Sequence, residues 1–323
     1  MEYCELGKTG IKVSRLCIGS LTVSPMQANL SLEEGSDVLA YAFENGINFT
    51  DTAQYYDNYR YIRRAIEKSK KYDTIISTKT YAYNRELAEK AFDEARRELN
   101  RDYIDIFMLH EQESIHTLRG HLEAAEFFFE MREKGLIKAV GASMHCVGAV
   151  EGICELKRLY PFSVIHPLYN KAGLGIADGN ITDMQNAMRK AKALGVGIFS
   201  MKALGGGNLI SSSKEAFDFV LDSMDDEANS LCDSVAVGMQ SIREVDANIS
   251  YFNSRSFGKD EENLQKNRKL LIEDYCEGCG KCVERCRQKA LRIENGKSTV
   301  DKDKCLLCGY CAGVCPLFAI KVI

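Results

Sequence analysis

The stretch TIISTKTYAYNRELAEKAFDEARRELNRDYIDIFMLH, residues 74–110, contains one complete unit of the fold. It opens with the short apolar segment Thr74–Lys79 and closes with a second one, Ile104–His110, and both have the length of a buried strand. Between them, Arg85–Leu99 places apolar residues at three- and four-residue intervals with charges between, which is typical of an amphipathic helix. This order predicts a βαβ unit with parallel strands.

The same alternation continues on both sides of this unit, about eight times between residue 12 and about residue 252. The expected strands are Val13–Gly19, Asn48–Asp51, Thr74–Lys79, Ile104–His110, Ala139–Ser143, Val164–Leu168, Gly197–Met201 and Val235–Gly238. Further helices are expected at Leu118–Lys134, Asp183–Leu194 and Ile242–Phe252. Eight such pairs predict an α/β fold, a (β/α)8 TIM barrel over residues 1–252, with an open doubly wound sheet as the alternative.

A second, smaller domain is expected after the barrel. Residues 253–273 are polar and lack strand character, so we interpret them as a linker that ends in a helix. Residues 274–323 contain an internal repeat, because Asp274-Tyr-Cys recurs as Asp303-Lys-Cys and Ala290-Leu-Arg-Ile recurs as Ala319-Ile-Lys-Val. A unit of this size with few large apolar residues needs a metal or disulfides for stability.

The overall composition excludes several classes of protein. With 45% hydrophobic and 27% charged residues the chain is folded rather than disordered. Forty-two basic against 46 acidic residues give a formal charge of −4, so no general attraction to nucleic acid or anionic membranes is expected. The charged N-terminal segment MEYCELGKTG is unlike a secretory leader, and no long apolar run occurs. We therefore expect a cytoplasmic protein.

Eight of the 13 cysteines fall in two copies of one motif, C-x2-C-x2-C-x3-C. Three thiolates two residues apart can bind one face of an iron–sulfur cubane, while the fourth points to the other cluster. The predicted ligands are therefore crossed between two [4Fe–4S] clusters: Cys276, Cys279, Cys282 and Cys315 for one, and Cys305, Cys308, Cys311 and Cys286 for the other. A pair of zinc sites is the alternative.

Residues 274–323 resemble the bacterial two-cluster [4Fe–4S] ferredoxins, which have a small α+β fold, over essentially their whole length. The second motif is followed by Pro316, whereas the first is followed by Arg287 where the family usually has proline. This difference does not affect a ligand. Two adjacent clusters favour electron transfer over a purely structural role.

Four chemically active side chains are expected at the ends of neighbouring barrel strands. Asp51, Lys79 and His110 end the second, third and fourth predicted strands, and Tyr56 lies in the loop after the second. The carboxyl ends of barrel strands line the active site, so these groups should converge. Each one alone is explained by an ordinary structural role, but the four together predict a catalytic site.

The chemistry available to these four groups is the reduction of a carbonyl compound. Tyr56 would donate the proton. Lys79 would lower the pKa of Tyr56, and Asp51 would pair with Lys79. His110 would hydrogen-bond the carbonyl oxygen as negative charge develops on it.

The segments Asp51-Thr-Ala-Gln-Tyr-Tyr56, Ser77-Thr-Lys79, Asp105 to His110, Gly141-Ala-Ser143 and Leu204-Gly-Gly-Gly207 resemble the aldo-keto reductase family. The opening ELGKTGIKVSRLCIGS and the segment from Gly238 to Asn248 do so as well, and the resemblance extends over roughly residues 3–252. It implies a (β/α)8 barrel that reduces aldehydes and ketones with NAD(P)H. It also implies that Asp51, Tyr56, Lys79 and His110 are the catalytic residues.

The same resemblance implies where the nicotinamide dinucleotide binds. The adenosine end would be held by Gly238, Ser241, Arg243, Asp246 and Asn248, and the nicotinamide end by Ser143, His166, Met201 and Lys202. The nicotinamide end departs from the family, which usually has asparagine at Met144, glutamine at His166 and an aromatic ring near Met201. Lys202 adds a positive charge that could serve a phosphate or an acidic substrate; the alternative is a solvated lysine at a strand end.

The whole chain resembles a subgroup of aldo-keto reductases fused to a two-cluster ferredoxin domain. The first functional hypothesis is NADP(H)- or NAD(H)-dependent reduction of a small carbonyl substrate beside the cluster relay. The second is electron transfer from the clusters to a flavin or substrate in the barrel, because hydride carries two electrons and a cluster passes one. The third is a non-catalytic redox carrier or sensor. A redox protein is the expected macromolecular partner, and we expect the ferredoxin domain near the barrel mouth.

Overall fold

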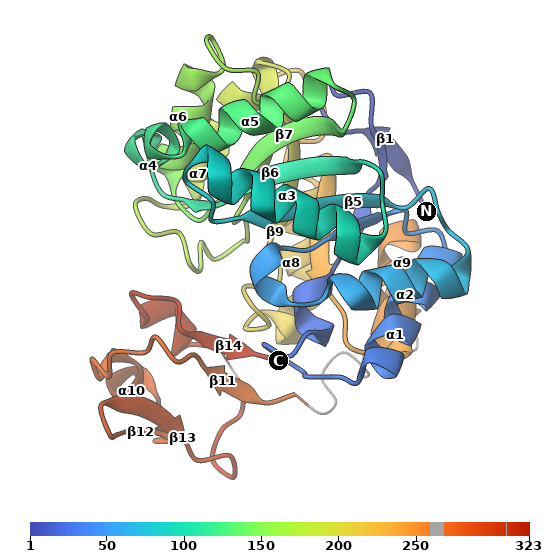
Figure 1. Ribbon diagram of the computed structural model, residues 1–323. Coiled ribbons are helices and arrows are strands. Elements are labelled where there is room, and N and C mark those ends of the chain that lie inside the picture. The colour runs from blue at the N-terminus through green and yellow to red at the C-terminus, as the bar shows by residue number, and fades with distance from the viewer. Residues whose placement is uncertain (259–267, 308) are drawn as a thin grey trace.

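A computed structural model of the chain describes residues 1–258, 268–307 and 309–323. Its larger part is a closed barrel of parallel strands, in the order β10-β3-β4-β5-β6-β7-β8-β9 (Figure 1). The barrel strands are β3 (Leu16–Gly19), β4 (Phe49–Asp51), β5 (Ile75–Thr80), β6 (Ile104–Gln112), β7 (Ile137–Met144), β8 (Val164–Pro167), β9 (Gly197–Met201) and β10 (Ser234–Gly238). The predicted TIM barrel is confirmed, because β10 pairs with β3 and closes the sheet.

Helices follow each of these strands and cover the outside of the barrel. They are α1 (Leu32–Glu44), α2 (Tyr59–Ser69), α3 (Arg85–Leu99), α4 (Ile115–Gly120), α5 (Leu122–Glu133), α6 (Val147–Leu156), α7 (Ile181–Ala193), α8 (Ser213–Leu221) and α9 (Ile242–Ser254). The single helix expected at Leu118–Lys134 is divided into α4 and α5 at Gly120 and His121. Glycine has low helix propensity, which makes this a favourable place for a break.

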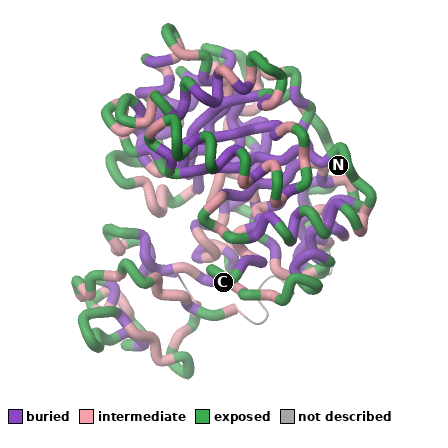
Figure 2. The backbone as a smooth tube through the Cα atoms, viewed as in Figure 1, coloured by how far each residue is buried: buried purple, intermediate pink, exposed green. Residues whose placement is uncertain are grey.

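The expected strand Val13–Gly19 is also divided. Lys12–Ser14 forms β2, which pairs antiparallel with β1 (Tyr3–Glu5), and only Leu16–Gly19 enters the barrel. The division occurs at Arg15, whose guanidinium donates to the carbonyl of Cys232 at 2.6 Å. Leu6, Ile11 and Val13 of the hairpin join a buried cluster with the inward-facing barrel residues Phe49 and Phe199. The hairpin therefore caps one end of the barrel, and Figure 2 shows the continuous buried interior.

The smaller domain contains two antiparallel two-stranded sheets. Their strands are β11 (Leu270–Ile272) with β14 (Ile320–Val322), and β12 (Leu291–Glu294) with β13 (Lys297–Val300). The short helix α10 (Lys281–Arg285) and a 3-10 turn at Ala312–Val314 complete it. The predicted linker and helix at 253–273 is wrong at Leu270–Ile272, which pairs with the last strand of the chain. Residues 259–267 lie outside the described residues.

The last residues of the chain dock against loops at the carboxyl end of the barrel. Val322 N–H donates to the carbonyl of Gly206 at 2.9 Å, and the Asn208 amide donates to the carbonyl of Ile320 at 3.2 Å. Gly207 and Gly175 approach so closely that a Cβ at Gly207 would lie 1.8 Å from Val322 O and one at Gly175 would lie 3.0 Å from Phe318. These loops follow β9 and β8, so the small domain lies beside the barrel mouth, as expected from the sequence.

No helix in the described ranges has both the length and the apolar character that crossing a membrane requires.

Candidate active site and cluster sites

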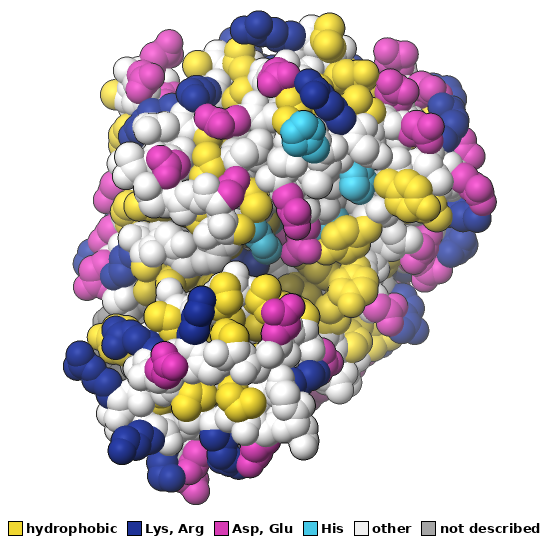
Figure 3. Space-filling model, turned by 90° about the vertical axis from the view of Figure 1, so that its left-hand side faces the viewer, with side chains coloured by type: hydrophobic (Ala, Val, Ile, Leu, Met, Phe, Trp, Pro, Cys, Tyr) yellow, Lys and Arg dark blue, Asp and Glu magenta, His cyan; other side chains and the backbone are white. Residues whose placement is uncertain are grey.

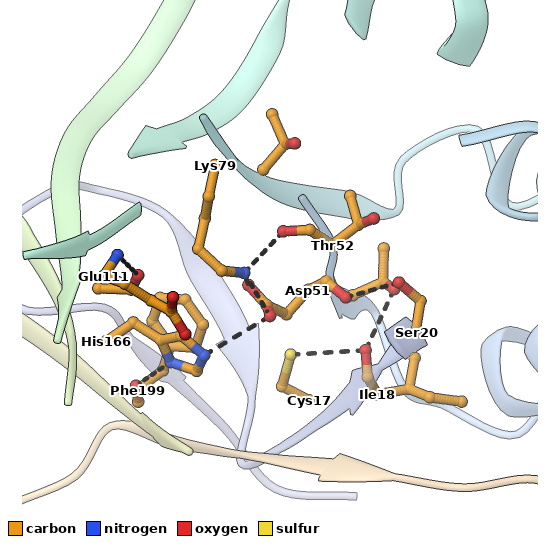
Figure 4. Close-up of polar contacts among 12 residues, drawn as sticks. Cys17, Ile18, Ser20, Asp51, Thr52, Lys79, Glu111, His166 and Phe199 are labelled. Atoms are coloured by element: carbon orange, nitrogen blue, oxygen red, sulfur yellow. Dashed lines mark hydrogen bonds and ion pairs between the residues drawn. The ribbon is translucent and has the colours of Figure 1, made fainter. Parts of the chain in front are cut away.

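The first three of the predicted catalytic groups come from adjacent elements at the mouth. Asp51 ends β4, Lys79 lies in β5, and Tyr56 ends the 3-10 turn Gln54–Tyr56 that follows β4. The Lys79 ammonium donates to both carboxylate oxygens of Asp51, at 2.7 and 2.6 Å, and to the carbonyl of Thr52 at 2.6 Å (Figure 4). Lys79 is 1% exposed and Asp51 5% exposed, so this is a buried ion pair.

The Asp51 carboxylate has a second basic neighbour. His166 Nε2 lies 3.5 Å from Asp51 Oδ2, and His166 Nδ1 donates to the carbonyl of Phe199 at 2.6 Å (Figure 4). Burial alone would raise the pKa of Asp51, but the Lys79 ammonium and the contact with the His166 ring hold it well below its usual range. Asp51 is therefore a permanent anion that fixes the Lys79 ammonium.

Tyr56 differs from the expectation in one respect. The Lys79 ammonium lies 5.3 Å from the centre of the Tyr56 ring, and its strong hydrogen bonds go to Asp51 and Thr52 instead of the phenol. Burial, together with the negative charges of Asp51 and Glu111, raises the pKa of Tyr56 well above its usual value. The net pKa of Tyr56 is thus raised and not lowered as predicted, because the distant Lys79 ammonium does not outweigh burial and the neighbouring carboxylates, and Tyr56 is held as the neutral, proton-bearing phenol.

His110 lies between two aromatic rings. The Tyr56 ring meets it edge-on at 5.7 Å, and the Tyr81 ring stacks on it at 4.4 Å. Burial and the nearby Lys79 charge lower the pKa of His110 well below its usual value, so the imidazole is neutral. Within the described part of the chain, His110 Nδ1 has no hydrogen-bond partner, although the residue is only 4% exposed. A buried polar atom without a partner is suited to a ligand.

The residues expected at the nicotinamide end are only partly available. The Ser143 hydroxyl accepts the Glu111 N–H at 2.9 Å, and Met144 is fully buried at the end of β7. His166 is 2% exposed and both of its ring nitrogens face protein oxygens. Met201 ends β9 and remains partly exposed. At this end the structure has a histidine tied to Asp51 where the family has a free amide.

Residues expected at the adenosine end lie together at the start of α9. Ser241 caps this helix and Gly238 ends β10 just before it, while Asp246 accepts the Tyr41 hydroxyl at 2.9 Å. Arg243 is exposed, and Asn248 is buried with its Oδ1 unpaired among the described residues, as is Nε2 of nearby Gln240. These unsatisfied buried atoms fit a polar ligand such as a nucleotide.

The first cluster site is assembled as the crossed assignment predicts. Cys276, Cys279, Cys282 and Cys315 line one cavity, with Ser298 and Pro316. Three of these cysteines come from one motif and the fourth from the other, which is the ligand set of one [4Fe–4S] cluster in a two-cluster domain. The lining of the cavity therefore fits such a cluster.

The second cluster site repeats the local geometry of the first. Ala319 N–H donates to Cys315 Sγ and Ala290 N–H to Cys286 Sγ, both at 3.3 Å and both four residues after the cysteine. Cys305 and Cys311 are partly or fully buried, while Cys308 lies outside the described residues. Backbone N–H donors to sulfur stabilise a negatively charged cluster.

Four functional candidates were missed from the sequence alone. Tyr81 stacks on His110, and its hydroxyl donates to Glu111. His145 accepts a hydrogen bond from Lys202 at 2.9 Å, and Phe318 lies with its ring centre 5.1 Å from the same Lys202 ammonium. Glu111 directly follows a predicted strand end, and Tyr81 and His145 each lie two residues after one, so position was the available signal. Phe318 had none, because it comes from the other domain.

Comparisons with known proteins agree with this geometry. A model of the "Aldo/keto reductase family" matches residues 15–233, and a model of the "4Fe-4S dicluster domain" matches residues 275–319. An L-galactose dehydrogenase of Arabidopsis thaliana is 24% identical over 307 residues, which are 84% of this chain and 94% of that protein. A component of an ion-translocating oxidoreductase complex of Methanosarcina acetivorans is 37% identical over 57 residues, 18% of this chain and 22% of that protein.

Among solved structures, an aldo-keto reductase from Bacillus halodurans has a TM-score of 0.65 at 20% identity, over 82% of this chain and 96% of that one. At this identity the similarity concerns the fold. The family model, in contrast, extends from just before β3 to the residue before β10 and includes all four candidate catalytic residues. The chain therefore belongs to the aldo/keto reductase family and carries a 4Fe-4S dicluster domain after its barrel.

Proposed function

We propose that the barrel reduces the carbonyl group of a small aldehyde or ketone, with Tyr56 as the proton donor. The observation that carries the proposal is the convergence of Tyr56 and His110, with ring centres 5.7 Å apart, above the buried Asp51–Lys79 pair. A bound NAD(P)H supplies the hydride to the carbonyl carbon. NADP(H) is the preferred form in this proposal, and NAD(H) the alternative.

The protein groups have separate tasks in this reaction. Tyr56 holds a proton at its phenol oxygen and transfers it to the carbonyl oxygen, which completes the alcohol. His110 is neutral, so one ring nitrogen carries a hydrogen that can donate to the same oxygen. The Lys79 ammonium lies 5.3 Å from the centre of the Tyr56 ring, so its positive charge offsets part of the negative charge that forms on the phenol oxygen. Asp51 holds the Lys79 ammonium in place.

The experiment compares Tyr56→Phe with Tyr55→Phe. Tyr55 is 63% exposed and adjacent in sequence, so it is a matched control for the loss of one hydroxyl. We expect oxidation of NADPH or NADH with 4-nitrobenzaldehyde to fall by a factor of about 10² or more in Tyr56→Phe, since a positioned proton donor contributes about 10²–10⁴-fold. Equal rates in the two variants would refute the role of Tyr56.

A second candidate is electron transfer between the first cluster and a molecule in the barrel mouth. The supporting observation is that Phe318, three residues after the cluster ligand Cys315, lies beside the barrel residues Lys202 and Gly175. Clusters supply one-electron transfer when bound, so the acceptor would be a flavin or a substrate that accepts single electrons.

The test is anaerobic addition of NADPH without a carbonyl compound, with the visible cluster absorbance followed over time. Bleaching would support electronic connection of the two sites. An unchanged spectrum with NADPH shown to bind would refute electron exchange between the dinucleotide and the clusters and leave the hydride-transfer proposal intact.

A further inference from the structure

Lys202 is the residue directly after β9, and its side chain extends across the barrel mouth. Its backbone is left-handed, with φ of 59°, which is uncommon for a residue with a side chain. The ammonium donates to Nε2 of His145, which follows β7, at 2.9 Å. Since β8 lies between β7 and β9 in the barrel, the side chain spans one strand end and points away from β10.

The charged side chains around Lys202 already interact with other groups. On the small domain, Lys321 forms an ion pair with Glu273. On the barrel, Glu111 accepts the Tyr81 hydroxyl and lies 4.0 Å from His145. In the part of the chain that the structure describes, Lys202 itself forms no ion pair; its contacts are His145 and the Phe318 ring. Of Lys202 and Lys321, Lys202 is therefore the one without a carboxylate partner among the described residues.

The surroundings of Lys202 do not compensate its charge. Burial and the like charge of Lys321 lower the pKa of Lys202 to about 7, against the attraction of Glu111 and Glu273. A partly buried ammonium without a counter-ion is unfavourable, so an anion placed here would be bound tightly. Figure 3 shows the hollow between the barrel and the smaller domain, with histidine, acidic and basic side chains at its edge.

We propose that Lys202 and His145 bind an acidic group of the substrate, a carboxylate or phosphate, beneath Phe318. This inference rests on the proposed carbonyl reduction and specifies its substrate as an aldehyde or ketone that carries an acid. We assign the anion to the substrate and not to the adenosine end of the dinucleotide, because Lys202 points toward β7, away from the Ser241 region expected to hold adenosine. The labelling experiment below distinguishes the substrate from the rest of the dinucleotide.

The small domain contributes directly to this subsite. Phe318 stands over the Lys202 ammonium at 5.1 Å, and Gly175 leaves the space that the Phe318 ring fills. Val322 and Gly206 hold the domain in this position by a backbone hydrogen bond of 2.9 Å. The ferredoxin domain thus acts as one wall of the substrate pocket, whatever it does in electron transfer.

The kinetic test compares an acid with its uncharged analogue, 4-carboxybenzaldehyde and methyl 4-formylbenzoate. We expect the ratio of kcat/KM for acid over ester to fall about tenfold or more in Lys202→Met, since a charge-assisted hydrogen bond is lost. Lys202→Arg should keep part of the preference. Lys190→Met removes an exposed lysine on α7 and should keep all of it. An unchanged ratio in Lys202→Met would overturn the proposal.

A second measurement does not depend on turnover. The cluster-loaded protein is acetylated over a range of pH, and labelling of Lys202 and Lys190 is followed by mass spectrometry. We expect malonate and inorganic phosphate to slow labelling of Lys202 and raise its apparent pKa, without affecting Lys190. Protection by NADPH but by neither acid would assign the anion to the dinucleotide and overturn the proposal. Protection by malonate without any carbonyl turnover would support the subsite while refuting the proposed reaction.

Discussion

The substitution Gly207→Ala should weaken the docking of the small domain on the barrel, because a side chain at Gly207 would collide with the backbone of Val322. An added Cβ would lie 1.8 Å from Val322 O, where real contacts are not shorter than about 3.0 Å. The backbones must therefore separate by about 1.2 Å, which is 3.0 Å less 1.8 Å. That movement stretches the 2.9 Å hydrogen bond from Val322 to Gly206 to about 4 Å, beyond the range of a hydrogen bond.

Gly206→Ala is the matched control. Gly206 also has a left-handed backbone, with φ of 62° against 83° at Gly207, so both alanines incur a conformational cost of about 1–2 kcal/mol. A Cβ at Gly206 would, however, meet only side chains, the end of the Phe318 ring at 3.3 Å and Lys321 Cγ at 3.4 Å, and these can move. The difference between the two variants isolates the clash with the Val322 backbone.

The assay is anaerobic hydrogen exchange of the C-terminal peptide, followed by mass spectrometry on the cluster-loaded protein. Loss of two hydrogen bonds, those of Val322 to Gly206 and Asn208 to Ile320, weakens docking by about 2 kcal/mol at about 1 kcal/mol each. This corresponds to about 30-fold faster exchange in Gly207→Ala than in Gly206→Ala. Equal exchange in the two variants would refute the docked arrangement.

Two further predictions concern the catalytic groups. Lys79→Met leaves the Asp51 carboxylate buried without its main partner, so it should lower the free energy of unfolding by about 3–5 kcal/mol. Adding Asp51→Asn should restore part of this loss, and anaerobic urea unfolding measures both values. An equal loss in the single and the double variant would contradict the prediction. Burial lowers the pKa of His110, His145 and His166, so the unfolded chain binds more protons than the folded chain below about pH 6.5, and stability should fall as the pH drops from about 7 to 5. The unfolding temperature of His110→Gln should decrease less steeply with falling pH than that of the parent protein. An equal slope would count against a buried neutral imidazole at His110.

The sequence by itself determined the barrel, the cluster domain and the strand ends at which Asp51, Lys79 and His110 lie. These features depend on local patterns. Alternation of short apolar runs with amphipathic helices indicates parallel βαβ units wherever it occurs, and the spacing of cysteines within one motif decides which thiolates can bind one cluster. Arg85–Leu99, for example, has the same bounds in the sequence pattern and in the structure.

Only the tertiary structure decided which partners these residues have. Leu270–Ile272 is a strand because Ile320–Val322 pairs with it, and nothing within 270–272 signals a partner fifty residues away. Lys79 donates to Asp51 and Thr52 rather than to Tyr56, a choice set by distances across the mouth. The contact of Lys202 with His145 beneath Phe318 is likewise set by distances across the barrel mouth. Contacts between distant segments depend on how strands close and domains dock, and a periodicity of two or 3.6 residues contains no information on either.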